Sequence, residues 1–266
     1  MTALRRRPLQ QFLGNEEEQV RQMDFRILGP IEAVRAGQPV PLAGPQQRSV
    51  LAALLLARGR MVSVDRLVRL LWAERPPATA RTQLRKRVSE LRAVLGADRI
   101  RSWREGYAVR LESGELDLDR FLDEVRRATV LRDAGRPAEA SDALAAGLEW
   151  WRGPALADGT DELTDAEAPQ LEEARLAAIE QRVAVRLDLG HHPQVIGELV
   201  TLVRRHPFRE RLRGQLMLAL HRSGRTADGL GVYRDWRAEL SAQLAIEPGR
   251  ELRDLHRALL GGDVFC

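Results

Sequence analysis

The chain has 266 residues, of which 44% are hydrophobic and 30% charged, a composition typical of a globular protein long enough for two domains. Its longest apolar run, residues 50–57, is too short to span a bilayer, and its single cysteine, Cys266, excludes an intramolecular disulfide. Residues 24–112 carry 17 Lys and Arg against 8 Asp and Glu, whereas residues 113–266 carry 21 against 27, so a basic segment that suits nucleic acid precedes an acidic one.

Residues 1–23 are polar and lack a sustained hydrophobic period, which predicts a flexible tail. Three arginines, Arg5 to Arg7, lie near its start, but acidic residues follow them instead of the apolar core of a signal peptide. We therefore expect a cytoplasmic protein that does not contact a membrane.

Short strand patterns begin at Asp24 and predict a small antiparallel sheet from residues 25–28, 31–35 and 40–42. Two helices are expected next, over residues 46–58 and 64–72. Ser63 is the expected N-cap of the second of these helices.

A third helix is predicted over residues 79–95, with Thr79 as its cap and Gly96 after its end. One stripe of this helix is apolar, because leucine or valine recurs at spacings of four, three and four, at Leu84, Val88, Leu91 and Leu95. The opposite arc and its flank carry hydroxyl groups and cations, namely Arg81, Thr82, Arg85, Lys86, Ser89 and Arg92. Such a face fits a DNA major groove, although an arginine-rich chain also produces solvated basic helices.

A hairpin follows, with strands over residues 99–103 and 107–111 joined by a three-residue loop in which Gly106 is expected to be left-handed. Strands, three helices and a terminal hairpin predict an α+β winged helix-turn-helix over residues 24–112, with residues 79–95 as the reading helix. This context favours DNA binding over a merely solvated face and adds Arg104, in the wing, to the expected DNA contacts. We expect this segment to bind DNA on its own.

The remaining chain, residues 113–262, predicts an all-α domain. Its helices are expected over residues 118–134, 137–151, 165–189, 193–205, 209–223, 226–243 and 249–260. Gly190 and Gly224 each end a helix and lie 34 residues apart, which is the tetratricopeptide period. The pattern therefore favours a tetratricopeptide-like domain, with an ordinary helical bundle as the alternative.

Motifs for catalysis or cofactor binding are not found. Lys86 is the only lysine, so a phosphate-binding loop of the Gly-Lys-[Ser/Thr] type cannot occur. The His191–His192 pair has no acidic or cysteine partner at metal-ligand spacing. We therefore expect neither an enzyme, nor a cofactor, nor a metal site.

Several stretches resemble the Streptomyces antibiotic regulatory protein (SARP) family of bacterial transcriptional activators. They are Val-Ser-Val-Asp-Arg-Leu at 62–67, Val-Ser-Glu-Leu-Arg at 88–92, Trp-Arg-Gly-Pro-Ala-Leu at 151–156, His-Pro-Phe-Arg-Glu-Arg-Leu at 206–212 and Ile-Glu-Pro-Gly at 246–249. The resemblance implies an OmpR-type winged helix on direct repeats of double-stranded DNA upstream of biosynthetic-cluster promoters. It further implies a bacterial transcriptional activation domain and RNA polymerase with its sigma factor as partner, and it is compatible with a homodimer on DNA.

The linker between the second and the reading helix cannot enter the groove with that helix, so Glu74 and Arg75 in this linker are the expected polymerase contacts. Two alternatives remain open from the sequence. The chain could be a helical-repeat adaptor that binds proteins, or a repressor that uses the same DNA contacts.

Overall fold

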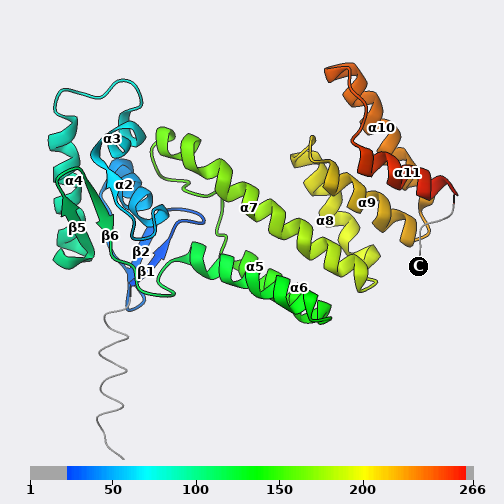
Figure 1. Ribbon diagram of the computed structural model, residues 1–266, viewed down its shortest axis with the longest axis horizontal. Coiled ribbons are helices and arrows are strands. Elements are labelled where there is room, and N and C mark those ends of the chain that lie inside the picture. Colours follow the sequence, from blue (N-terminus) through cyan, green and yellow to red (C-terminus); the bar gives the residue numbers. More distant parts are fainter. Residues whose placement is uncertain (1–22, 262–266) are drawn as a thin grey trace, which may run out of the picture. The chain divides into compact units, whose positions relative to one another are not determined.

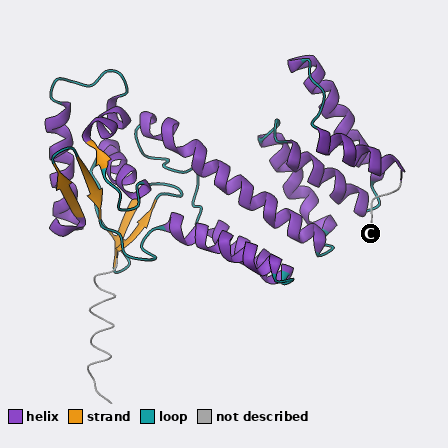
Figure 2. Ribbon diagram, viewed as in Figure 1, coloured by secondary structure: helices purple, strands orange, loops and turns teal. Residues whose placement is uncertain are grey.

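The computed structural model describes residues 23–261, and the predicted tail with Arg5 to Arg7 lies outside these described residues (Figures 1 and 2). Two compact units divide the chain: residues up to 123 with residues 146–175, and residues 124–145 with the residues from 176 onward. Three helices pass from one unit into the other, α5 (Asp117–Asp133), α6 (Pro137–Glu149) and α7 (Asp161–Asp188). The first unit therefore contains more than the predicted winged helix.

The first sheet is antiparallel with strand order β1-β2-β3, formed by β1 (Met23–Arg26), β2 (Glu32–Arg35) and β3 (Gln38–Pro39). Ala36 and Gly37 both have positive φ, 48° and 77°, and make a two-residue turn that suits the twist of a hairpin. Because the turn is so tight, the third strand begins at Gln38, and the expected strand at 40–42 is wrong.

Three helices follow the first sheet, α2 (Gly44–Leu56), α3 (Val64–Trp72) and α4 (Ala80–Leu95). The predicted Ser63 cap is confirmed, since its hydroxyl accepts the backbone N–H of Arg66 at 3.2 Å. Thr79 does flank α4, but its side chain forms no capping bond and instead accepts the side-chain amide of Gln83 at 3.0 Å.

The wing is a second antiparallel sheet, ordered β4-β6-β5, which contains β4 (Val62–Ser63), β5 (Ile100–Trp103) and β6 (Gly106–Val109), with the 3-10 helix η1 (Ala97–Arg99) before β5. Strand β4 was not predicted, because a strand of two residues is too short to show the alternation of apolar and polar residues that identifies a strand. The expected three-residue loop is also wrong, because Gly106 lies in β6 and pairs with Trp103. A Cβ at Gly106 would lie 2.3 Å from the carbonyl oxygen of Val62, so close packing against β4 is what requires glycine there.

The second unit is helical, as predicted, and its last helices are α8 (His192–Arg205), α9 (Glu210–Arg222), α10 (Thr226–Leu244) and α11 (Arg250–Gly261). Gly190 and Gly224 have φ of 81° and 76°, the left-handed conformation that ends a helix. One apolar cluster joins the end of α7 to α8 and α9, and a second joins α9 to α10 and α11 around the buried Trp236. These pairwise contacts between successive helices are typical of repeat architecture.

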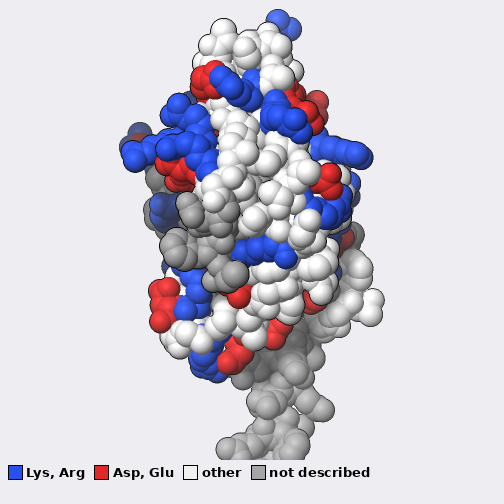
Figure 3. Space-filling model, turned by 90° about the vertical axis from the view of Figure 1, so that its right-hand side faces the viewer, with Lys and Arg blue, Asp and Glu red and all other residues white. Residues whose placement is uncertain are grey.

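The surface charge of this helical half is mixed despite its net acidic composition. On the face shown in Figure 3, Lys and Arg lie mainly along the margins of a largely uncharged area, with Asp and Glu beside them. Helix α11 presents the exposed Arg250, Arg253 and Arg257.

Candidate nucleic-acid interface

Helix α4 is anchored by its predicted apolar stripe. Leu84, Val88 and Leu91 are at most 1% exposed and Leu95 is 3% exposed. They pack the helix against α2 and α3. The opposite arc is exposed at Thr82, Arg85, Lys86 and Ser89, so the division of the helix into two faces is confirmed.

Most cations of residues 24–112 already have a partner inside the first unit. Those with a carboxylate within 4.0 Å are Arg26, Arg48, Arg58, Arg66, Arg81, Lys86, Arg87, Arg99 and Arg110. Arg35, Arg60 and Arg92 donate to backbone carbonyl groups. Within the described residues, no side-chain hydrogen bond or ion pair is formed by Arg69, Arg75, Arg85, Arg101 and Arg104.

Two cations on the outward face of α4 are therefore available to a ligand. Arg85 is exposed and unpaired among the described residues. Lys86 is 70% exposed, and its Nζ lies 3.9 Å from the Glu90 carboxylate, a distance at which the pair contributes little. Arg81 pairs with Asp65 at 2.7 Å, but both side chains are about two-thirds exposed (67% and 68%), so a phosphate could displace the carboxylate at small cost.

Arg92 is directed to the wing rather than outward. Its Nε and Nη2 donate to the Ile100 carbonyl oxygen at 2.9 and 2.6 Å, and Nη2 also donates to Ser102 Oγ at 2.7 Å. These bonds hold β5 beside the reading helix. The sequence grouped Arg92 with the outward cations because its position on the helical wheel carries no information about β5.

The C-terminal end of α4 is also held by an arginine from β2. Arg35 Nη2 donates to the carbonyl oxygens of Val94 and Leu95, both at 2.9 Å, and so satisfies two carbonyl groups of the last helical turn. Arg99 forms two bonds of 2.8 Å to the buried Glu115 carboxylate, which also accepts the N–H of Met23. The reading helix and the wing are thus tied to the first sheet by guanidinium groups.

The wing adds cations of its own. Arg104 and Glu105 form the two-residue turn between β5 and β6, where the Arg104 side chain is exposed. Arg101, which was not among the expected contacts, is also exposed. Arg101 could have been identified from strand alternation in the sequence, which places the side chains of Arg101 and Trp103 on the same face of β5.

The linker between α3 and α4 is exposed from Ala73 to Thr79. Ala73 has φ 48°, a conformation that turns the chain sharply at the end of α3. Glu74 and Arg75 have no side-chain partner among the described residues. Their side chains are therefore free to meet another molecule.

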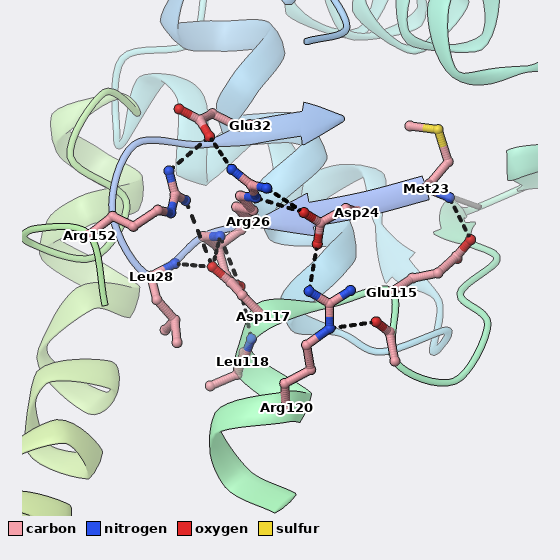
Figure 4. Close-up of polar contacts among 12 residues, drawn as sticks. Met23, Asp24, Arg26, Leu28, Glu32, Glu115, Asp117, Leu118, Arg120 and Arg152 are labelled. Carbon is pink, nitrogen blue, oxygen red and sulfur yellow. Dashed lines mark hydrogen bonds and ion pairs between the residues drawn. The ribbon is translucent and has the colours of Figure 1, made fainter. Parts of the chain in front are cut away.

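Residues that follow the wing in the chain form hydrogen bonds with the first sheet and its turn (Figure 4). The buried Asp117 carboxylate accepts the backbone N–H groups of Ile27, Leu28 and Leu118 at 2.8 to 3.0 Å, and Arg152 lies 3.8 Å away. Burial outweighs these favourable contacts and raises the pKa of Asp117 to about 6.

The segment that follows α6 lies along the turn between β1 and β2. The backbone N–H groups of Arg152, Leu156 and Ala157 donate to the carbonyl oxygens of Leu28, Ile27 and Gly29, respectively. Asp158 in turn accepts the N–H of Ile31 at 2.7 Å. The Trp-Arg-Gly-Pro-Ala-Leu stretch is thus part of the compact unit that carries the reading helix.

Two family models match the chain, "Transcriptional regulatory protein, C terminal" over residues 37–109 and "Bacterial transcriptional activator domain" over residues 116–260. Regulatory protein DnrI of Streptomyces peucetius is 34% identical over 256 residues, a match that covers 91% of this chain and 93% of DnrI. The chain belongs to the SARP family of transcriptional regulators. The predicted fold class, an OmpR-type winged helix followed by a helical domain, is confirmed.

Other SARP-like relatives are longer. Regulatory protein AfsR of Streptomyces coelicolor is 41% identical over 249 residues, which are 93% of this chain but 25% of AfsR. A solved structure of Mycobacterium tuberculosis EmbR in complex with a low-affinity phosphopeptide has a TM-score of 0.85 and 36% identity to this SARP chain, covering 92% of it and 66% of that chain. The chain thus spans only part of AfsR and of that EmbR chain.

Among the described residues of this SARP protein, no helix is long and apolar enough to cross a membrane. The same residues contain no group of three or more His, Cys, Asp or Glu side chains that could hold a metal ion.

Proposed function

We propose that this SARP protein is a sequence-specific transcriptional activator that places α4 in the major groove of direct-repeat sites upstream of promoters. The observation that carries this proposal is the grouping of cations that are unpaired or only weakly paired. Arg85 and Lys86 on α4 are joined by Arg101 and Arg104 on the adjoining wing, while most other cations of this segment are engaged internally. Exposed guanidinium and ammonium groups on one helix and its neighbouring hairpin suit phosphates and guanine edges. A DNA-bound regulator acts in the cytoplasm.

The proposed contacts divide into readers and positioners. Lys86 and Arg85 lie on the outward face and are proposed to reach base edges, whereas Arg81, Thr82 and Ser89 are proposed to contact phosphates. Arg104 contacts DNA from the wing. Arg92 contributes by holding the wing, because its guanidinium is already occupied by Ile100 and Ser102.

Selection of binding sites from random double-stranded DNA tests this proposal. Lys86→Ala should lose about 1–3 kcal/mol of binding free energy and relax one position of the selected site. Arg127→Ala is a matched control, because Arg127 is an exposed cation on α5 that pairs with Glu124 in the helical unit. An unchanged selected site for Lys86→Ala would contradict its reading role, and failure of the wild type to select any sequence would contradict the proposal.

Head-to-tail binding on direct repeats predicts a strict spacing. Two copies on one face of the duplex require centres one helical turn, about 10–10.5 base pairs, or a multiple apart. Inserting half a turn between the repeats should abolish cooperative binding while each half-site still binds one copy. Undiminished cooperativity after the insertion would exclude this arrangement.

Activation is proposed to include contact with RNA polymerase and its sigma factor through Glu74 and Arg75. Their exposure in the linker between α3 and α4 supports this step, as does family membership. A Glu74→Ala, Arg75→Ala double variant should bind DNA normally and fail to activate transcription with purified polymerase. Full activation by the variant would leave the helical unit as the surface that contacts polymerase. The family name points to secondary-metabolite promoters as the targets.

A further inference from the structure

The turn between α8 and α9 is strongly basic, although it belongs to the acidic half of the chain. Residues 204–213 contain five arginines against one glutamate, whereas residues 113–266 as a whole carry 21 Lys and Arg against 27 Asp and Glu. The one glutamate, Glu210, accepts the Trp236 Nε1–H at 3.0 Å and the Gly249 backbone N–H. Its carboxylate is therefore used inside the helical unit and is not available to the arginines of the turn.

Three of these five arginines are exposed. Arg204 and Arg205 form no side-chain hydrogen bond or ion pair among the described residues. Arg211 is 59% exposed, and its Nε lies 3.9 Å from the Glu180 carboxylate, which already binds Arg209 at 2.6 Å. Because a pair at that distance contributes little, all three guanidinium groups are available to an acidic partner.

The same turn exposes an aromatic side chain. Phe208 is 58% exposed, and its ring meets that of the buried Trp236 at an angle of 66°, with the centroids 5.9 Å apart. Arg213 lies over the Trp236 ring, 4.0 Å from its centroid, and so helps to fix the indole that supports Phe208. A supported aromatic residue among arginines has the composition of a protein–protein contact that dominates binding energy. We call the exposed side chains Arg204, Arg205, Phe208 and Arg211 the basic turn.

The N-terminal part of α7 has the complementary charge. Residues 161–174 contain six Asp and Glu and no Lys or Arg. Asp161, Asp165 and Pro169 are exposed and recur every four residues on one stripe, and Ala166 beside them is exposed as well. Neither aspartate has a side-chain partner among the described residues. The helix dipole favours acidic residues in the first turn only, so it does not account for Asp165. We call Asp161, Asp165, Ala166 and Pro169 the acidic stripe.

We propose that the basic turn of one copy of the chain docks on the acidic stripe of a second copy. The Phe208 ring then packs on Ala166 and Pro169, and the guanidinium groups of the turn pair with Asp161 and Asp165. The two surfaces differ, so the contact is heterologous and joins copies head to tail, as direct repeats require. This inference rests on the proposed function and assigns the surfaces through which neighbouring copies cooperate. Since the paired charges are exposed, the contact weakens as salt is added.

The first test is crosslinking without DNA, in chains that all carry Cys266→Ser. One chain carries Ala166→Cys in the acidic stripe, and the other carries Thr201→Cys, an exposed position one helical turn before Arg205. A short bismaleimide should join these two chains at low salt. Arg257→Cys on α11, also exposed, replaces Thr201→Cys in the control mixture and should give little product. Equal yields from the two mixtures would overturn the inference.

Charge reversal makes this crosslink specific. Arg204→Glu with Arg205→Glu in the Thr201→Cys chain should lower the yield about tenfold, because attraction is replaced by repulsion. Asp161→Arg with Asp165→Arg in the Ala166→Cys chain should restore it. Absence of this rescue in variants that keep their circular dichroism spectra would overturn the inference. So would a crosslink formed inside a single chain that carries both cysteines, at a yield independent of concentration, because the contact would then lie within one molecule.

The second test measures cooperativity of the full chain on a duplex that carries two copies of the selected site. Arg204→Glu with Arg205→Glu should reduce cooperativity about tenfold and leave the affinity for a single site unchanged. Arg250→Glu with Arg257→Glu on α11 is the matched control, because it makes the same change of charge at two exposed positions and should behave as wild type. Undiminished cooperativity of the Arg204, Arg205 variant would overturn the inference while Lys86-dependent binding to a single site, and with it the proposed function, stood. Failure of the wild type to bind a single site would instead contradict the proposed function, and the crosslinking result would still decide whether the two surfaces dock.

Discussion

Truncation after residue 112 should unfold the unit that carries α4, although all winged-helix elements precede that point. Five backbone N–H groups of the first sheet and its turn donate to acceptors beyond residue 112, namely those of Met23, Phe25, Ile27, Leu28 and Ile31. At about 0.5–1.5 kcal/mol for each bond, their loss costs roughly 2.5–7.5 kcal/mol. This compares with a total stability of about 5–15 kcal/mol for a domain.

Lost apolar packing adds to that cost. Leu116, Leu118, Phe121 and Leu156 are 1%, 4%, 0% and 0% exposed, and a fragment ending at residue 112 lacks all four. A fragment covering residues 23–175 contains the whole described part of the first unit and serves as the control. The sequence-based expectation that residues 24–112 bind DNA alone is therefore replaced by the prediction that the longer fragment binds and the shorter does not.

Urea denaturation of the two fragments, followed by circular dichroism, decides between these two expectations. The fragment of residues 23–175 should show a cooperative transition, and the fragment of residues 23–112 should lack one or have a far lower midpoint. Equal midpoints and equal DNA affinity for the two fragments would refute the reasoning, because the hydrogen bonds that Glu115, Asp117 and Asp158 accept would then contribute nothing measurable.

Three further predictions concern single positions. Because burial raises the pKa of Asp117 from its ordinary 3.8 to about 6, the contribution of this group to stability is largest below pH 3.8 and is lost as the pH rises through 6. Between pH 4 and 7, the free energy of unfolding of the wild type, measured by urea denaturation, should therefore fall by on the order of 3 kcal/mol relative to that of the non-titrating Asp117→Asn. Parallel pH profiles for the two proteins would contradict the raised pKa. Gly231→Ala should raise the free energy of unfolding by about 0.5–1 kcal/mol, since Gly231 lies inside α10 and a Cβ there would meet only Arg234 Nη2, 4.0 Å away. Gly229→Ala should raise the free energy of unfolding by less than Gly231→Ala, because a Cβ at Gly229 would lie 3.0 Å from the Met217 carbonyl oxygen. A larger increase for Gly229→Ala would be inconsistent with that contact. Arg92→Ala should speed hydrogen exchange in β5 much more than Ser102→Ala, which removes only one of the three bonds; equal exchange rates would show that Arg92 does not hold the wing.

Local signals in the sequence were sufficient for the helices and for the two faces of α4. The spacing of Leu84, Val88 and Leu91 depends only on the helical period, so the buried stripe and the exposed arc opposite it followed without knowledge of the partner. Ser63 and Gly190 act within one turn of the helices that they bound, and both were predicted correctly. Family membership was likewise readable from short motifs.

Tertiary structure alone decided which cations are free. Arg85 and Arg92 have the same charge and lie on the same helix, yet one remains unpaired among the described residues while the other binds the carbonyl group of Ile100. Likewise, two of the backbone N–H groups that donate to Asp117, those of Ile27 and Leu28, lie about 90 residues earlier in the chain. Hydrogen-bond partners far apart in sequence are selected by the packing of whole elements, whereas helical period and capping act over a few residues, and the free energy of a guanidinium or carboxylate depends on the partner that packing supplies.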